Sequence, residues 1–306
     1  MDHAQDVQFA HGDTMLAGTL RRPEGSEPHP ALVMLQGSGP ADRDSDGYFP
    51  PLRDHFVGSG FAVLSWDKPG IGGSTGRWTR MTIFDRAAEA LTAIKWLRLQ
   101  DGIDASRVGI WGHSQGGWVG PLAASQSRDL AFLIVNSGPA IGLHEQDLYG
   151  IEHTLRDDGV DDEEIARALE FMRAIHTAAL RGASYDEVKQ TILEEARGKP
   201  RFDYLGDFGS DEWHLEVIYA QHPYDPAPPL ALITCPMLVI FGELDPLVPV
   251  QKSARVFESL GASSGHDVTV RIFPGANHRI KVGEPKDFAP GYLDTMTQWI
   301  WERIRS

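Results

Sequence analysis

Residues 107–125, RVGIWGHSQGGWVGPLAAS, place a serine in a glycine-rich turn between two apolar segments. The run RVGIW is typical of a buried strand, and GGWVGPLAAS is typical of a helix. Between them, GHSQG matches G-x-S-x-G, a motif in which a sharp strand-to-helix turn exposes a serine hydroxyl. The amino end of the following helix stabilises negative charge that develops beside that serine. This arrangement favours Ser114 as a nucleophile over a simple turn of small residues.

A serine hydroxyl needs a base to activate it and an acid that orients the base. After an elbow of this kind, the expected chain order is serine, then Asp or Glu, then His. Asp245 follows the apolar run MLVIFGEL, and His278 follows VTVRIFPGAN, so both stand at the carboxyl end of a predicted strand. We therefore predict a triad of Ser114, Asp245 and His278. Glu243 is the nearest alternative acid, but Asp245 lies further beyond the strand, directly before Pro246.

Short apolar runs and amphipathic helices alternate on both sides of the elbow. The N-terminal runs at 7–10 and 14–20 flank a Gly-Asp turn and predict a β-hairpin. Continuous apolar strands separated by helices are typical of a mostly parallel central sheet with helices on both faces, an α/β fold. Further strands are expected at 30–36, 61–67, 107–112, 130–138, 236–245 and 267–275, and helices at 50–60, 82–99, 116–127, 251–261 and 292–304.

The alternation stops between Leu143 and Pro228, where the chain becomes acidic and helical, with helices expected at 163–180 and 184–197. We interpret residues 143–228 as a helical cap inserted into a core formed by 1–142 and 229–306. The aromatic residues near its end are expected to form the core of the cap, or alternatively to line a substrate pocket, because apolar walls dominate such pockets. They are Trp213, Tyr219 and Tyr224.

The composition excludes several classes of protein. The chain has 306 residues with 42% apolar and 23% charged side chains, as expected for one large globular α/β domain. Its formal charge of −15 argues against nucleic acid or an anionic membrane as a partner. The single cysteine, Cys235, excludes an intrachain disulfide. The polar start has no apolar segment typical of a signal peptide, and no run is long enough to span a membrane, so the expected location is the cytoplasm.

Two further motifs resemble ligand-binding loops, one for calcium and one for a dinucleotide, but neither has the required residues at the required spacing. Residues 35–47, LQGSGPADRDSDG, have aspartates at the spacing of a calcium loop, but the twelfth position is Arg53 and a strand precedes the loop. GIGGSTG at 70–76 has the wrong spacing for a dinucleotide-binding G-x-G-x-x-G. The remaining histidines show no paired metal spacing. We predict neither a metal nor an organic cofactor.

These features together resemble the α/β-hydrolase superfamily over nearly the whole chain. The chain is more similar to carboxylesterases related to dienelactone hydrolases and to acyl-peptidase catalytic domains than to lipases. The matching segments are GSGPADRD (37–44), SWDKPGIGGS (65–74), GHSQGG (112–117), CPMLVIFGELD (235–245) and FPGANH (273–278). In such proteins the first of these segments is the oxyanion loop, the second is a structural turn beside the pocket, and the last three carry the triad.

Two positions depart from the pattern of these relatives. Gln36 stands where many have the histidine of a His-Gly pair, which leaves the orientation of the loop open, and Lys68 stands where arginine is usual before Pro-Gly. Acyl transfer creates an oxyanion that two backbone N–H groups must meet. One comes from the residue after the nucleophile, Gln115, and the loop after the third strand supplies the other through Ser38.

The sequence therefore predicts a serine hydrolase that cleaves carboxylic esters, or thioesters, of small to medium size. An acyltransferase, a perhydrolase or a lyase with the same triad remains an alternative, as does a non-catalytic member that binds a small ligand. A peptidase is less favoured, because no propeller or other gating domain precedes the hydrolase. The partner expected is a small-molecule ester, and the acidic surface disfavours anionic substrates such as coenzyme A esters. The sequence leaves the oligomeric state open.

Overall fold

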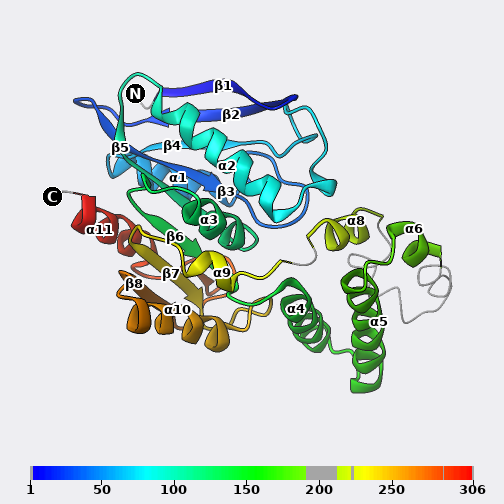
Figure 1. Cartoon of the computed structure of the whole chain (residues 1–306). Coiled ribbons are helices and arrows are strands. Elements are labelled where there is room, and N and C mark those ends of the chain that lie inside the picture. The colour runs from blue at the N-terminus through cyan, green and yellow to red at the C-terminus, as the bar shows by residue number, and fades with distance from the viewer. Residues whose placement is uncertain (1–2, 191–211, 222–223, 285, 305–306) are drawn as a thin grey trace.

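An eight-stranded sheet forms the centre of the computed structural model, which describes residues 3–190, 212–221, 224–284 and 286–304 (Figure 1). Its strand order is β1-β2-β4-β3-β5-β6-β7-β8. β1 pairs antiparallel with β2, β2 pairs antiparallel with β4, and every later pair is parallel. The strands are β1 (His3–His11), β2 (Thr14–Arg22), β3 (His29–Leu35), β4 (Ala62–Trp66), β5 (Ile103–His113), β6 (Leu133–Asn136), β7 (Met237–Gly242) and β8 (Val268–Phe273). The predicted hairpin and the mostly parallel sheet are confirmed.

Helices cover both faces of the sheet because successive side chains of a strand point to opposite faces. In β3, Val33 belongs to one apolar cluster and Leu32 and Met34 to the other. The helices α2 (Ile83–Arg98), α3 (Gly116–Ser125) and α10 (Val250–Ser264) pack on the first face, and α1 (Phe49–Gly58) and α11 (Tyr292–Ile304) on the second. The predicted α/β architecture with two covered faces is thus present.

In the described part of the segment between β6 and β7 there are five helices: α4 (Leu143–Asp157), α5 (Asp162–Leu180), α6 (Tyr185–Val188), α8 (Glu212–Gln221) and α9 (Ala227–Leu230). In Figure 1, α4, α5, α6 and α8 lie beyond the carboxyl ends of the parallel strands. They enclose an apolar cluster of their own, which includes Leu155, Met172 and Ile218. By contrast, α9 packs against α3 on the sheet.

The aromatic residues of this insertion separate into two groups. Tyr219 packs against the apolar cluster of the inserted helices. Tyr224 belongs to the main core instead, and its hydroxyl donates to the carbonyl of Trp118 at 3.3 Å. The side chain of Trp213 and the second half of the helix predicted at 184–197, from residue 191 on, lie outside the described residues.

Three short elements were not expected from the sequence: a 3-10 turn, η1 (Trp78–Arg80), and the pair β9 (Lys281–Val282) and β10 (Asp287–Phe288).

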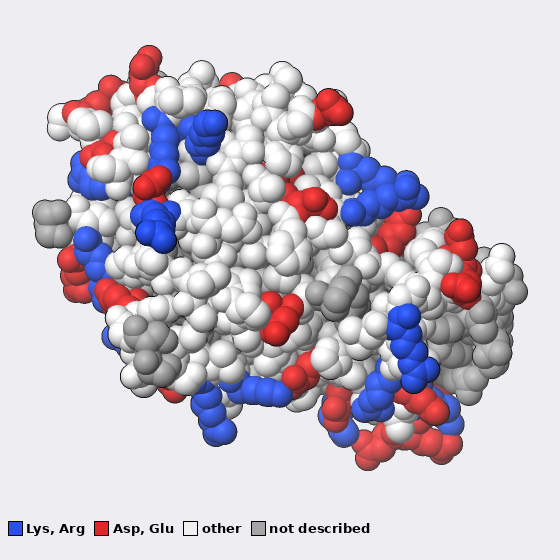
Figure 2. Space-filling model, in the orientation of Figure 1, with Lys and Arg blue, Asp and Glu red and all other residues white. Residues whose placement is uncertain are grey.

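In the described ranges, no helix is long and apolar enough to cross a bilayer. Figure 2 shows Lys and Arg scattered over this face rather than gathered, with acidic and basic side chains mixed near α5. There, Arg156 pairs with Asp162 at 2.8 Å and Arg167 pairs with Glu163 at 2.6 Å.

Candidate active site

The sharp turn expected at G-x-S-x-G is present. Between β5 and α3, Ser114 has φ of 54°, in the left-handed region that is strained for a serine. Its N–H donates to the carbonyl of Asn136 at 2.9 Å, which ties the turn to β6. A Cβ added at Gly117 would lie 2.3 Å from the Cα of Gly138, and one at Gly112 would lie 2.2 Å from the carbonyl oxygen of Gly116. The flanking glycines are therefore required by close backbone contact.

The structure brings Asp245 and His278 together. Asp245 lies in the turn after β7, and its Oδ1 accepts from the N–H groups of Leu247 at 2.8 Å and Val248 at 3.1 Å. Its Oδ2 lies 2.7 Å from Nδ1 of His278 in the turn after β8. Because an ionised carboxylate only accepts, Nδ1 carries the hydrogen and Nε2 remains the proton acceptor of a neutral imidazole. The alternative acid, Glu243, instead accepts from the N–H of Gly275 at 2.8 Å.

His278 lies beside the elbow through contact with His113, the residue before Ser114. The two imidazole rings have centroids 4.8 Å apart. Behind them, Asn136 Oδ1 accepts from the hydroxyl of Tyr292 at 2.8 Å, so its Nδ2 donates to Nδ1 of His113 at 3.1 Å. This donor requires an unprotonated Nδ1, and His113 is therefore neutral. Burial, followed by the electrostatic influence of His278 and Arg279, holds the pKa of His113 well below its usual range.

Sequence reasoning missed this buried network. Its members come from distant parts of the chain, and Tyr48 is the fourth, with its hydroxyl 3.3 Å from Nδ2 of Asn136. Burial raises the pKa values of both Tyr48 and Tyr292, so both hydroxyls stay protonated. No local sequence signal marks a residue of this kind, because each is an ordinary core residue of its own element.

The loop after β3 touches the nucleophile. A Cβ added at Gly37 would lie 3.2 Å from Cβ of Ser114. Ser38 and Gly39 border the same cavity as Ser114 and Gln115. Among the described residues, neither the Ser38 N–H nor the Gln115 N–H donates to another protein group. The two predicted donors are thus close to Ser114 and available to a ligand.

Gln36, which stands where many relatives have a histidine, holds the base of the loop after β3 through its side chain. Its Nε2 donates to the carbonyl of Trp66 and, at 3.4 Å, to that of Asp42. The side chain therefore joins the base of the loop to the end of β4, so the loop keeps a defined orientation without the histidine.

The acidic stretch at 42–46 is held by ion pairs and turn hydrogen bonds. Arg43 binds Asp67 through its guanidinium at 2.8 Å and through its own N–H at 2.8 Å. Burial alone would raise the pKa of Asp67, but the hydrogen bonds from Arg43 and from the N–H of Gly73 outweigh it and lower that pKa. Arg53, whose position argued against calcium, pairs with Asp44 at 2.8 Å. In the described part of the chain, no three His, Cys, Asp or Glu side chains group as metal ligands.

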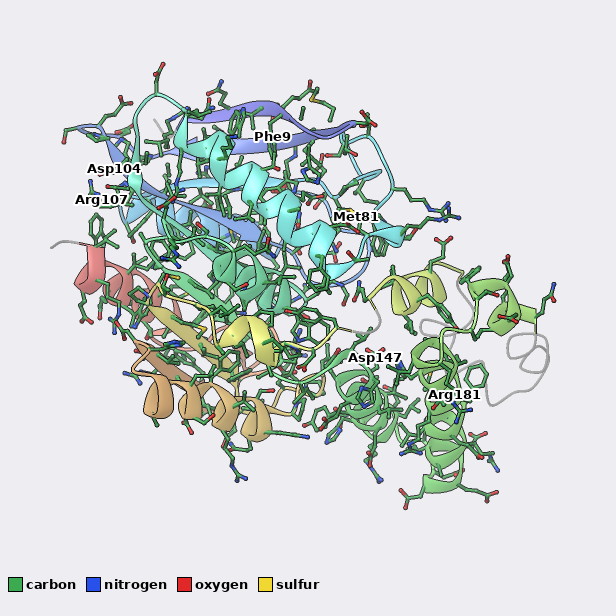
Figure 3. All side chains as sticks on the ribbon, viewed as in Figure 1. Phe9, Met81, Asp104, Arg107, Asp147 and Arg181 are labelled. Carbon is green, nitrogen blue, oxygen red and sulfur yellow. The ribbon has the colours of Figure 1, made fainter. Side chains whose placement is uncertain are left out.

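A cavity of about 230 Å³ opens beside Ser114, between the sheet and the inserted helices. Its apolar walls are Trp118, Pro139, Leu143, Val217, Ile218, Leu247 and Val248. To the same cavity, α4 and α8 contribute the polar side chains of Gln146, Asp147 and Gln221. Asp147 comes from α4, which lies between the sheet and α5 in Figure 3, and its Oδ2 is 3.4 Å from Nε2 of His176.

The chain is similar to known esterases and lipases. Esterase EstD of Thermotoga maritima is 27% identical over 286 residues, covering 91% of this chain and 61% of that protein. Monoacylglycerol lipase of Mycolicibacterium smegmatis is 22% identical and covers 90% of this chain and 89% of the relative. Among solved structures, the Pyrococcus furiosus esterase Pf2001 shares the fold with a TM-score of 0.65 at 16% identity, covering 99% of this chain and 91% of that one.

The family evidence extends over most of the sequence. Residues 12–276 match the model described as X-Pro dipeptidyl-peptidase (S15 family). That range includes the loop after β3, the elbow and Asp245, and it ends two residues before His278. With the fold of the solved esterases and the strand-turn-helix around Ser114, this match shows that the chain is an α/β-hydrolase and belongs to the X-Pro dipeptidyl-peptidase (S15) family.

Proposed function

We propose that this protein is a serine hydrolase of carboxylic esters, small to medium in size, and that it acts through an acyl-enzyme on Ser114. The observation that carries the proposal is the 2.7 Å hydrogen bond between Asp245 and His278, with the His278 ring against the residue that precedes Ser114. The names of EstD and Pf2001, both esterases, support the same chemistry.

In the proposed mechanism, Ser114 Oγ attacks the ester carbonyl while Nε2 of His278 takes its proton. Asp245 keeps the hydrogen on Nδ1 and stabilises the imidazolium that forms. The N–H groups of Gln115 and Ser38 donate to the oxyanion of the tetrahedral intermediate. When that intermediate collapses, His278 gives the proton to the departing alcohol. Water then attacks the acyl-enzyme with His278 again as the base, and this step releases the acid and free Ser114.

The inserted helices serve, in this proposal, as a cap of residues 143–228 on a core of 1–142 and 229–306. Their separate apolar cluster and their share of the cavity wall support that division. Tyr224 belongs to the main apolar core and α9 packs against α3, so the return to the core begins slightly earlier, at Tyr224. The cap then limits substrate size, and the Asp147 carboxylate favours neutral or cationic substrates over anionic ones.

Hydrolysis of peptides next to proline is the second candidate, and the description of the matching family favours it. The same triad can cleave an amide if His278 protonates the departing amine. The two candidates differ in the leaving group and share the acyl-enzyme on Ser114.

A parallel assay distinguishes these candidates. Nitrophenyl esters of increasing acyl length and X-Pro nitroanilides are given to the wild type and to Ser114→Ala, followed by mass analysis after a fluorophosphonate. We expect ester turnover that is lost by roughly 10⁴-fold or more in Ser114→Ala, together with the adduct on Ser114. Preferential anilide cleavage would support the peptidase. An adduct without turnover of either substrate would favour acyl transfer or lyase chemistry, and unchanged hydrolysis by Ser114→Ala would refute the mechanism.

A further inference from the structure

Lys68 is a fully buried cation beside the candidate oxyanion loop. It follows β4, and its Nζ lies 2.5 Å from the carbonyl oxygen of Gly37 and 2.6 Å from that of Gly39. The ammonium also lies 5.2 Å from the ring centroid of Trp78. Burying an ammonium is costly unless hydrogen bonds replace its water. Here the replacement is made by two carbonyl groups of one short loop.

The bond to Gly37 determines where the next N–H points. The carbonyl of Gly37 and the N–H of Ser38 belong to the same peptide unit, and in a planar trans peptide they point in opposite directions. With the carbonyl held toward Lys68, the Ser38 N–H is directed away from Lys68. Ser38 borders the cavity together with Ser114, and Gly37 contacts Ser114. The N–H is therefore held on the side of the nucleophile.

We propose that Lys68 is a positioning residue for the oxyanion hole, which fixes the direction of the Ser38 N–H by binding the carbonyls on either side of Ser38. The inference rests on the proposed hydrolase function. Lys68 touches neither the substrate nor the reacting atoms, and it acts only through the peptide unit that joins Gly37 to Ser38.

The turn that carries Lys68 holds the loop along its length. The N–H of Lys68 donates to the carbonyl of Ala41 at 3.1 Å, and the neighbouring Asp67 binds Arg43. Two adjacent residues thus fasten the loop from residue 37 to residue 43. Burial and then the charge of Arg86 depress the pKa of Lys68, and Glu89 partly opposes them. Either protonation state of the amine has enough hydrogens for both carbonyls.

The test separates a positioning role from a general structural one. Lys68→Met keeps the length of the side chain without its donors, Lys68→Arg keeps donors, and Lys95→Met removes an exposed lysine of α2 as the control. For each protein, kcat and KM for a nitrophenyl ester are measured, with the thermal unfolding midpoint. Inhibition by an alkyl boronic acid is also measured, since its tetrahedral serine adduct mimics the reaction intermediate.

We expect Lys68→Met to lower kcat by about 10- to 100-fold with little change in KM, because losing a whole oxyanion donor costs ~10²–10³-fold. Boronic acid affinity should fall in parallel with kcat/KM. Lys68→Arg should recover part of both, and Lys95→Met should match the wild type. Normal kcat and boronate affinity in folded Lys68→Met would overturn the proposal. If Lys68→Met does not fold, Lys68→Gln, which has an NH2 group on a shorter side chain, is measured with the same criteria.

A double-mutant cycle gives a second criterion. Ser38→Pro removes the N–H itself, so adding Lys68→Met to Ser38→Pro should cause no further loss of kcat. Losses that multiply would show that Lys68 acts elsewhere and would contradict the inference. A wild type without ester turnover and without a Ser114 adduct would instead refute the proposed function, so the two failures are distinguishable.

Discussion

At the residue scale, the site depends on keeping one of two adjacent imidazoles neutral. His113 and His278 are in ring contact, and two positive charges at that separation would repel each other. Asn136 prevents this by donating to Nδ1 of His113. His278 can therefore accept the proton of Ser114 without a charged neighbour behind it.

The buried His113 makes stability depend on pH. Its pKa in the folded protein lies below the ordinary value of 6.5, so unfolded chains bind this proton first as the pH falls. The contribution to stability is complete above pH 6.5 and is lost as the pH falls from there toward the folded pKa. In His113→Gln, urea unfolding at pH 7 and pH 5 should show a smaller pH-dependent loss of the free energy of unfolding. The difference is at most about 1.4 kcal/mol per pH unit, and equal losses in both proteins would contradict the neutral state of His113.

Asp147 should set charge selectivity, because its carboxylate lies in the cavity wall. Asp147→Asn is expected to raise kcat/KM for an ester with a carboxylate-bearing acyl chain relative to a neutral ester of the same length by about tenfold, equivalent to ~1.4 kcal/mol. Asp157→Asn, which changes an exposed acid of the same helix, is the control. An unchanged ratio in Asp147→Asn would show that the acyl chain does not reach this wall.

At the scale of elements, a carboxylate of α8 binds the core at η1. Glu216 binds the Arg77 guanidinium at 2.5 Å and accepts from the Thr79 hydroxyl at 2.7 Å. Burial raises the pKa of Glu216, but the hydrogen bonds from Thr79 and Arg77 outweigh that effect and lower the pKa. The carboxylate therefore stays ionised. The next residues of α8, Val217 and Ile218, line the cavity. This contact therefore holds a wall of the cavity in place.

Glu216→Gln should loosen that wall. We expect KM for a long-chain ester to rise by up to about fivefold with a smaller change in kcat, since a partly exposed ion pair contributes up to about 1 kcal/mol. The increase should shrink at high salt, where the wild-type pair is screened. Steady-state kinetics at low and high salt test this, with Asp162→Asn, which breaks an exposed pair between α4 and α5, as the control. A KM that does not change would mean that α8 does not depend on Glu216.

At the scale of the whole molecule, the insertion leaves and re-enters the core at one place. A Cβ added at Gly142 would lie 3.6 Å from the carbonyl oxygen of Tyr224. Leu143 and Tyr224 both belong to the main apolar core, whereas the helices between them have their own cluster. The core therefore has little need of the intervening residues for its own packing.

Replacing residues 144–223 with a short Gly-Ser linker should leave a folded core. We expect cooperative thermal unfolding and a fluorophosphonate adduct on Ser114 in the shortened protein, because the triad residues are all in the core. Selectivity for acyl length should decrease, since α4 and α8 form much of the cavity wall. An aggregated or non-cooperative product would contradict the division into core and cap.

Local patterns predicted much of this architecture. The runs at 30–36 and 61–67 appear as β3 and β4, because continuous apolar segments of this short length bounded by turns are typical of buried strands. The sequence also identified Asp245 and His278, whose proximity in the structure follows from parallel strands that end at one edge of the sheet. Their catalytic roles stay a prediction for the Ser114→Ala assay. The short pair β9 and β10 was not predicted, because two residues per strand carry no periodic signal.

The sequence by itself determined the α/β frame, the elbow at Ser114 and the order of the candidate triad, because each depends on neighbours within a few residues. Tertiary structure decided how these parts are held. Lys68 reaches Gly37 across 31 positions, and Asn136 reaches Tyr292 across 156. Such contacts depend on which strands become neighbours and on the directions of individual peptide units. The local pattern around Lys68 identifies only a turn, and the folded chain places its Nζ against the carbonyls of Gly37 and Gly39 in the loop after β3.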